Sequence, residues 1–480
     1  MCARTSCCLG ANASLRSQMR TAKRATAGLI LSGGWLVVFG GVAAGQMAND
    51  APATREVPPL AGAAALEGAL AAWLTEAQAV AASMQAAIHA GDAAAYLKHV
   101  VPAGGALGDT CFRQEQVGLA GDFAKRPVPD FAWTLEAGEV TIREQGITPR
   151  DLWPTPAAVN TPTRLELRAS MSWTPAGASK PRNLVLPVAF VRADAGAAWL
   201  YAGERWQRHV RDADASTGFA GALVRFAAGD KVLAKEASLI AAQLPRVRRE
   251  VDEHFGVRVK GVQEVKLYRS KAHLQGSVWL NYTDSLGGWN EPGESIKILV
   301  TDSTARRILG IVAHEYGHVA SFELGPKATG APWWALEGCA ELASEGFRTD
   351  AKAKRDARVA GWLKRGELAP WADITPFPLK PEHARFNAHV YTQGEHLLAF
   401  VRDRFGADGY RALLVAMCQG ESVEAASEKG LGKPWLEVDA LWRAEIQRQV
   451  DAAAAKALKK PDMLDPAGVP EKGPMQEGGQ

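Results

Sequence analysis

The chain has 480 residues, of which 47% are hydrophobic and 22% are charged, the composition of a globular protein longer than one compact core usually needs. Its 55 lysines and arginines against 52 aspartates and glutamates give a formal net charge of +3, which is too small to indicate a nucleic-acid-binding protein. These values predict two domains and no nucleic-acid partner.

The first 44 residues differ from the rest in charge and hydropathy. They contain five basic residues and no acidic ones, and the last three, Arg20, Lys23 and Arg24, precede the apolar run AGLILSGGWLVVFGGVAA at 27–44. The run ends in small residues and is short and glycine-rich for a membrane span. We therefore interpret residues 1–44 as a secretory signal peptide, which predicts a periplasmic or secreted protein.

The alternative for this segment is an uncleaved membrane anchor, with the chain held at the membrane. Cleavage would leave a protein with no stable membrane span and a net charge of 3 − 5 = −2. The start of translation is either Met1 or Met19. Three cysteines follow the segment, and they permit one disulfide in any of three connectivities. No CxxC pair occurs, which argues against a cysteine-based zinc site.

An accessory domain is predicted over 61–212, after a polar, proline-containing linker at 45–60. Apolar residues at helical spacing predict a helix over 64–90, and a second short helix follows Gly91. The pattern then changes to period two, which is typical of half-buried strands. The strand residues are Phe131, Trp133 and Leu135, and the segments TRLELRASMSW, NLVLPVAFV and AAWLYAGERW.

The last two of these strands are separated by RADAG, which predicts a hairpin. Helices followed by an antiparallel sheet predict an α+β domain. This order resembles, in topology, the cone-shaped nuclear-transport-factor-two-like fold. The domain contains no catalytic constellation, and the sequence does not identify its partner.

A second, mostly helical domain with a small upstream sheet is predicted over 218–456. Helical spacing covers 218–255 and ends at Gly256, and EVKLYRS and SIKILVT predict strands on either side of a glycine-rich loop. Nearly all that follows is helical to about 458. The tail at 457–480 is rich in proline and glycine, which predicts disorder.

One helix in this domain carries the residues of a metal site. In IVAHEYGHVASFE, at 311–323, His314 and His318 are four apart and lie on one face of a helix. Two imidazoles so placed can bind one cation. Glu315 lies about 100° further round the helix, where it can flank a metal-bound water without being a ligand. This is the HExxH arrangement.

The next predicted helix supplies a third ligand. Eighteen residues separate His318 from Glu337, in APWWALEGCAELASEG, and Pro332 favours a helix start there. Glu337 and Glu341 then lie one turn apart. Glu337 can bind the metal, and Glu341 can accept a hydrogen bond from His314 and so fix its tautomer. Imidazole and carboxylate ligands together predict Zn²⁺.

HExxH, eighteen residues and Glu-Gly on a second helix resemble the gluzincin metallopeptidases, the clan of thermolysin and the aminopeptidase-N-like enzymes. PWWALEGCAE, VYTQGEHLLAFVRDRFG and GLGKPWLEVDALWRAEI resemble the bacterial secreted members called peptidase-MA-like. The resemblance covers about residues 218–450. It implies zinc ligands His314, His318 and Glu337, general base Glu315 and a peptide or protein substrate.

The chain departs from this clan at two places. Leu336 stands where thermolysin-like enzymes commonly have asparagine. GGWNE, at 287–291, differs from the Gly-x-Met-Glu-Asn amine anchor of the aminopeptidases. The resemblance therefore favours an endopeptidase over an exopeptidase.

Hydrolysis by such a site needs a hydrogen-bond donor for the oxyanion as well as a base. Tyr391 is the candidate donor, because the family resemblance favours a tyrosine at the start of the helix YTQGEHLLAFVRDRF. His389 and His396 are alternatives. The strand at 295–300 is either an edge that pairs with extended substrate or a plain structural strand. Several tryptophans, including Trp371, can line a cleft or fill a core.

Two functions follow from the sequence. The first is a secreted or periplasmic zinc-dependent endopeptidase. The second is a binding protein whose accessory domain holds a ligand and whose metal site is structural or inactive. A structural zinc has four protein ligands, whereas a catalytic one leaves a position for water.

Overall fold

The computed structural model describes residues 28–32, 35–39, 63–103, 110–142, 164–193, 196–301 and 305–458. Most of the predicted signal peptide, the linker at 45–60 and the tail beyond 458 therefore lie outside the described residues. The chain divides into two units: Met1–Pro326 with Ala343–Thr349, and Lys327–Leu342 with Asp350–Gln480. Among the described residues, no helix has both the length and the apolar character needed to cross a membrane.

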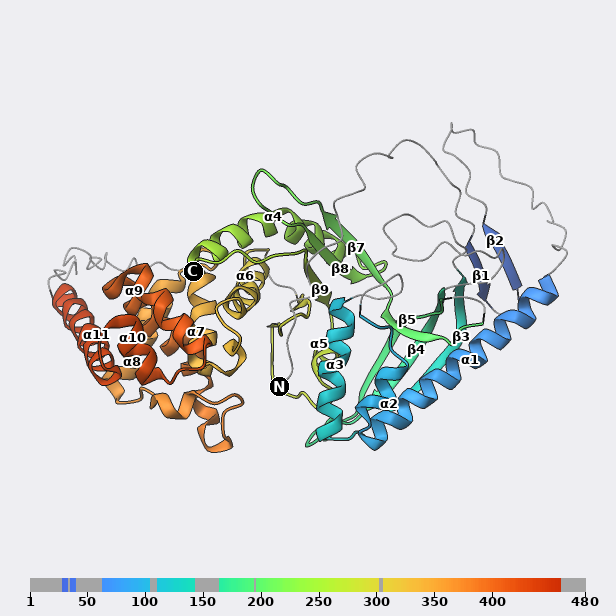
Figure 1. Ribbon diagram of the computed structural model, residues 1–480, viewed down its shortest axis with the longest axis horizontal. Coiled ribbons are helices and arrows are strands. Elements are labelled where there is room, and N and C mark those ends of the chain that lie inside the picture. The colour runs from blue at the N-terminus through green and yellow to red at the C-terminus, as the bar shows by residue number, and fades with distance from the viewer. Residues whose placement is uncertain are drawn as a thin grey trace, which may run out of the picture. The chain divides into compact units, whose positions relative to one another are not determined.

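The first unit begins with helices packed on an antiparallel sheet (Figure 1). The helices are α1 (Ala63–Ala90), α2 (Ala93–Lys98) and α3 (Thr110–Lys125). The sheet has the order β3 (Ala132–Ile142), β4 (Arg164–Trp173), β5 (Arg182–Val191) and β6 (Leu200–Glu204). An antiparallel hairpin, β1 (Gly28–Ser32) with β2 (Trp35–Phe39), also belongs to this unit.

The core of this layer comes from both helices and strands. Met84 of α1, Phe123 of α3, and Leu167 and Phe190 of the sheet are 0–2% exposed. The predicted helix, the alternating strands and the hairpin between β5 and β6 are all present. The helix α3 was not predicted from the sequence.

A second sheet follows in the same unit, with the order β10-β11-β9-β8-β7. Its strands are β7 (Trp206–Arg211), β8 (Ala222–Ala227), β9 (Gln263–Tyr268), β10 (Gly288–Trp289) and β11 (Ile296–Leu299). Its helices are α4 (Lys231–Phe255), α5 (Lys271–Val278) and α6 (Ala305–Phe322), with a short 3-10 turn, η2, at Glu345–Phe347.

The expectation of helix throughout 218–255 was wrong for its first part. Ala222, Val224 and Phe226 are buried alternately, and β8 pairs with β7 on one side and β9 on the other. Pairing on both sides satisfies the backbone groups of β8 as a strand. The helix α4 begins after Asp230, whose carboxylate caps it, and ends at Gly256 with φ of 68°.

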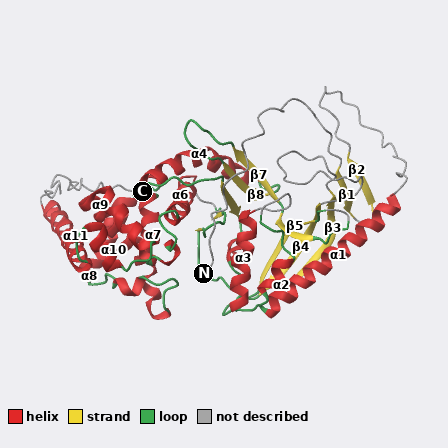
Figure 2. Cartoon of the chain, viewed as in Figure 1, coloured by secondary structure: helices red, strands yellow, loops and turns green. Residues whose placement is uncertain are grey.

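The second unit is almost entirely helical (Figure 2). Its helices are α7 (Trp333–Ala343), α8 (Ala351–Arg365), α9 (Asn387–Cys418), α10 (Val423–Leu431) and α11 (Trp435–Leu458). Short 3-10 turns connect them: η1 (Ala328–Gly330), η3 (Trp371–Ile374) and η4 (Pro381–Phe386). The overall fold class, an α+β part followed by a mostly helical part with a small upstream sheet, is therefore confirmed.

Tryptophans form the centre of the second unit. Trp334 packs on Trp371 and Trp435 with ring centroids 4.8 and 5.7 Å apart, and Trp371 packs on Trp442 at 5.3 Å. Trp334 is fully buried and belongs to the core, and Trp371 packs against it half-buried. None of the three described cysteines, Cys111, Cys339 and Cys418, forms a disulfide bond.

Candidate metal centre

One face of the helix α6 is apolar and packs into the core of the first unit. Ile308, Val312, Tyr316 and Ala320 are fully buried. The Tyr316 hydroxyl donates a hydrogen bond of 2.9 Å to Asp252 Oδ1 of α4, which fixes the rotation of α6 about its axis. The helix ends at Phe322, where the chain tightens into i→i+3 hydrogen bonds from the backbone N–H groups of Glu323 and Leu324.

His314 and His318 lie one turn apart on α6, as the sequence predicts. Their Nε2 atoms are 3.2 Å apart, and the two rings meet edge to face at 87°. Two nitrogens that each lie about 2.05 Å from one tetrahedral zinc are about 3.3 Å apart. The spacing therefore fits a pair of zinc ligands. Phe322 stacks against the ring of His318, with centroids 6.3 Å apart.

Glu315 is 6% exposed and lies against the strand β10. A Cβ built on Gly288 would be only 2.3 Å from Glu315 Oε1 and 2.7 Å from its Cδ. Glycine is therefore required at 288 for the strand to approach the carboxylate so closely. This role of Gly288 was not predicted from the sequence. The glycine pair beside a predicted strand was the available indication.

The edge strands of the second sheet are β10 and β7, and the strand at 295–300 is not at an edge. Gly288 pairs with Ile298, and Trp289 pairs with Lys297, so β10 covers one side of β11 while β9 covers the other. Glu291 lies two residues after the end of β10. Burial and the nearby carboxylate of Glu294 raise the pKa of Glu291 to about 7.

The helix α7 carries Glu337 and Glu341 one turn apart, as the sequence predicts. The indole Nε1 of Trp333 donates a hydrogen bond of 2.9 Å to Glu337 Oε1, which holds that carboxylate in one orientation. The hydrogen bond expected between Glu341 and His314 stays a prediction.

Gly338, the residue after Glu337, allows two helices to pack closely. A Cβ on Gly338 would lie 2.5 Å from the carbonyl carbon of Gly394, and a Cβ on Gly394 would lie 2.2 Å from the carbonyl oxygen of Trp334. The backbones of α7 and α9 therefore touch at these two glycines. This contact fixes the position of α7 relative to α9.

Tyr391 precedes Gly394 by three residues on α9, so it lies on the same helical face. Its ring is 6.2 Å from the ring of Trp333, the residue that holds Glu337. The two alternative donors have other contacts. His396 Nδ1 accepts a hydrogen bond from Trp442 Nε1, and His389 Nε2 lies 3.0 Å from the carbonyl oxygen of Glu367.

One group of three metal-ligating side chains occurs among the residues that the structure describes, and it consists of His314, His318 and Glu337. One nitrogen of each histidine and one carboxylate oxygen of Glu337 all lie within 4.8 Å of one another. This donor set is the one that the sequence predicts, and its chemistry suits zinc.

Comparison with known proteins gives structural likeness only. No family model and no curated protein matches the chain. Among solved structures it is similar to an M1 zinc metallopeptidase from Deinococcus radiodurans, at 18% identity and a TM-score of 0.34, over 66% of this chain and 70% of that one. A two-domain M1 zinc metallopeptidase bound to L-arginine gives 17% identity and a TM-score of 0.35, over 69% and 73% of the chains. Likeness at this level does not assign the chain to a family.

Proposed function

We propose that this chain is a zinc-dependent endopeptidase. The observation that carries the proposal is the grouping of His314, His318 and Glu337, with the two imidazole Nε2 atoms spaced as ligands of one tetrahedral ion. Glu315, next to His314 in the sequence, supplies a buried carboxylate that a purely structural zinc site does not need.

Each residue of the site has a chemical role in this proposal. Zinc in such a site lowers the pKa of water to about 7 and polarises a carbonyl oxygen. Glu315 accepts the proton of the attacking water and passes it to the nitrogen of the leaving amine. Gly288 leaves room for that carboxylate, and Trp333 orients the carboxylate of Glu337. Tyr391 donates a hydrogen bond to the oxyanion.

The substrate we propose is an extended segment of a peptide or unfolded protein. The free side of the edge strand β10 can pair with such a backbone, beside Glu315. Because GGWNE differs from the aminopeptidase anchor, we propose cleavage within a chain and not removal of its first residue.

The decisive experiment compares Glu315→Gln with Glu323→Gln. Both substitutions remove one carboxylate charge from the same stretch of chain, but Glu315 is buried and Glu323 is exposed. Hydrolysis of casein by the zinc-loaded protein should fall at least 1000-fold in the first variant and stay unchanged in the second. A chelator should abolish the activity of the original protein, and zinc should restore it. Equal rates in the Glu315→Gln variant and the original protein would overturn the mechanism.

The second candidate, a binding protein with a structural metal, predicts a different result. Its zinc would have four protein ligands and no exchangeable water, and casein would remain intact. Zinc X-ray absorption on the same sample counts the ligands. Three protein ligands and a water favour the endopeptidase.

We also propose that the chain is exported and that cleavage follows Ala44. The five basic residues and the apolar run at 27–44 support this. Expression of the full chain in a bacterium, followed by amino-terminal sequencing of the periplasmic fraction, tests it. Recovery of only the uncut chain in the membrane fraction would favour an anchor.

A further inference from the structure

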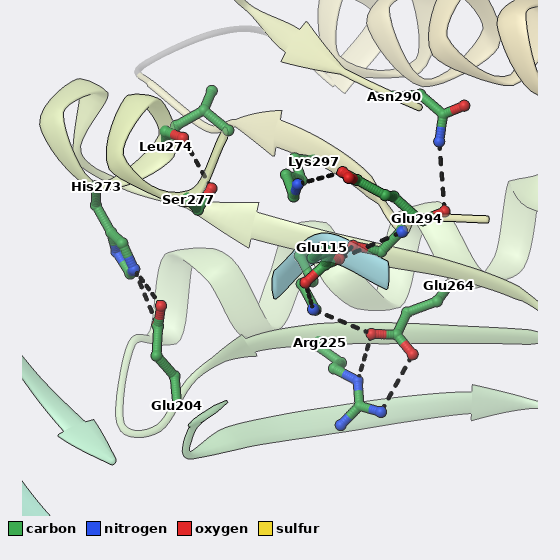
Figure 3. Close-up of polar contacts among 12 residues, drawn as sticks. Glu115, Glu204, Arg225, Glu264, His273, Leu274, Ser277, Asn290, Glu294 and Lys297 are labelled. Carbon is green, nitrogen blue, oxygen red and sulfur yellow. Dashed lines mark hydrogen bonds and ion pairs between the residues drawn. The ribbon is translucent and has the colours of Figure 1, made fainter. Parts of the chain in front are cut away.

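A buried ion-pair network joins the accessory helix α3 to the second sheet (Figure 3). Glu115 Oε2 accepts a hydrogen bond from Lys266 Nζ of β9 at 2.5 Å. Glu115 Oε1 accepts hydrogen bonds from the backbone N–H of Ser295, at 3.3 Å, and from its hydroxyl. Glu115, Lys266 and Ser295 are all at most 6% exposed. A charged group is buried in this way only when it is paired and hydrogen-bonded.

The same helix fits closely under the turn at 290–295, which joins β10 to β11. A Cβ on Gly118 would lie 2.9 Å from Glu294 Oε1. The turn is also closed from within, because Glu294 N donates to Glu291 O at 3.0 Å and Lys297 Nζ lies 2.7 Å from Glu294 Oε2. The turn therefore packs against α3 at Gly118, and the ion pair between Lys297 and Glu294 stabilises it.

The position of this turn sets the position of β10. This strand is two residues long, and its ladder to β11 has only two residue pairs. So short a strand cannot fix its own position, and it depends on the turn that follows it. At its other end, Gly288 touches the carboxylate of Glu315. Contacts therefore run from Glu115 through the turn and β10 to Glu315.

We propose that Glu115 is a positioning residue of the endopeptidase proposed above: it holds the turn at 290–295, and through β10 it holds the carboxylate of Glu315 in place. The inference rests on that proposed function for its effect on hydrolysis, but not for its effect on the turn. In this proposal the accessory domain supports the strand β10, which lies beside Glu315 in the catalytic site. Burial alone would raise the pKa of Glu115, but Lys266, Lys297 and the hydrogen bonds lower it to about 2, so the charge is present at neutral pH.

The test compares Glu115→Gln with Glu166→Gln in the full, zinc-loaded chain. Glu166 is a matched control, because it is 4% exposed, lies in the same domain and pairs with Arg164 and Arg205, at 2.8 and 3.1 Å, away from the turn. Two readouts are measured below the unfolding temperature. These are kcat and KM for casein, and hydrogen–deuterium exchange of the peptide that covers 287–296.

The Glu115→Gln variant should lose at least tenfold in kcat per bound zinc, and its 287–296 segment should exchange at least tenfold faster. The control should change in neither readout, although both variants can lose thermal stability. Ser295→Ala, which removes only the hydroxyl donor, should give a smaller change of about threefold in the same direction. This variant keeps the inference testable if Glu115→Gln does not fold.

The outcomes separate the two proposals. If the original protein does not cleave casein, the proposed function fails, while exchange still tests whether Glu115 holds the turn. If the original protein cleaves casein and Glu115→Gln has the same kcat, the inference fails and the function stands. Unchanged exchange at 287–296 in both Glu115→Gln and Ser295→Ala also overturns the inference.

Discussion

Gly288 lies so close to Glu315 that a methyl group on it would stand 2.3 Å from the carboxylate oxygen Oε1. A strand and a helix therefore meet at a point where one carries no side chain and the other carries the proposed base. Glu315 is 6% exposed, so its carboxylate has little room to move aside. The position of the base depends on the strand as much as on its own helix.

Gly288→Ala should lower kcat by about 100-fold, because the new methyl group displaces the carboxylate of Glu315 and a displacement of about 1 Å can cost that much. The control is Gly287→Ala, the adjacent residue, where a Cβ would lie 3.6 Å from Ile311 Cδ1, an ordinary contact. Casein hydrolysis by zinc-loaded samples measures both. Equal activity in the two variants would show that Gly288 does not set the position of the base.

Trp333→Phe should weaken zinc binding about 10- to 100-fold, the usual effect of losing a hydrogen bond to a metal ligand. The substitution removes the indole N–H that donates to Glu337 Oε1, at 2.9 Å, but keeps an aromatic ring against Phe377 and Tyr391. Competition with a chromophoric chelator measures the affinity. An unchanged dissociation constant would mean that Trp333 packs beside Glu337 without orienting it.

Tyr391→Phe should lower kcat by about 100- to 1000-fold with little change in KM, as expected when a donor to the oxyanion is lost. The ring contact with Trp333 needs no hydroxyl, so packing should survive. Steady-state kinetics at matched zinc content make the measurement. A fall in stability with kcat preserved would assign Tyr391 to packing alone.

Gly394→Ala should destabilise the second unit by about 1–3 kcal/mol, because its Cβ would lie 2.2 Å from the carbonyl oxygen of Trp334 and the helix backbones must separate. Gly330→Ala is the control, since a Cβ there meets nothing within 4 Å. Urea unfolding followed by tryptophan fluorescence compares the two. Equal stability of the variants would show that α7 and α9 can separate at low cost.

The approach of His314 to His318 could be predicted because their spacing is local: four residues on one helix bring the two imidazoles together without any knowledge of the fold. The α+β order followed from the change of hydrophobic period for the same reason. The role of β10 could not be predicted from the sequence. A strand of two residues has no periodicity, and tertiary contacts determine its position. The strand β8 lies within a segment that the sequence predicts as helix, because its strand conformation depends on pairing with β7 and β9. The network around Glu115 was not predicted, because it joins residues 151 and 180 positions apart.

His396 should make the fold sensitive to acid. Burial lowers the pKa of His396 from 6.5 to about 4, and its Nδ1 accepts the indole N–H of Trp442 at 2.9 Å. Between pH 6.5 and 4 the unfolded chain binds a proton at this residue and the folded chain does not, so stability falls as the pH falls. Between pH 7 and 5 this one residue accounts for about 2 kcal/mol. His396→Gln keeps an acceptor for Trp442 and removes the titration, so its stability should fall less over that range. Urea unfolding at pH 7 and pH 5 decides the matter, and an equal loss in both proteins would show that His396 is not the source.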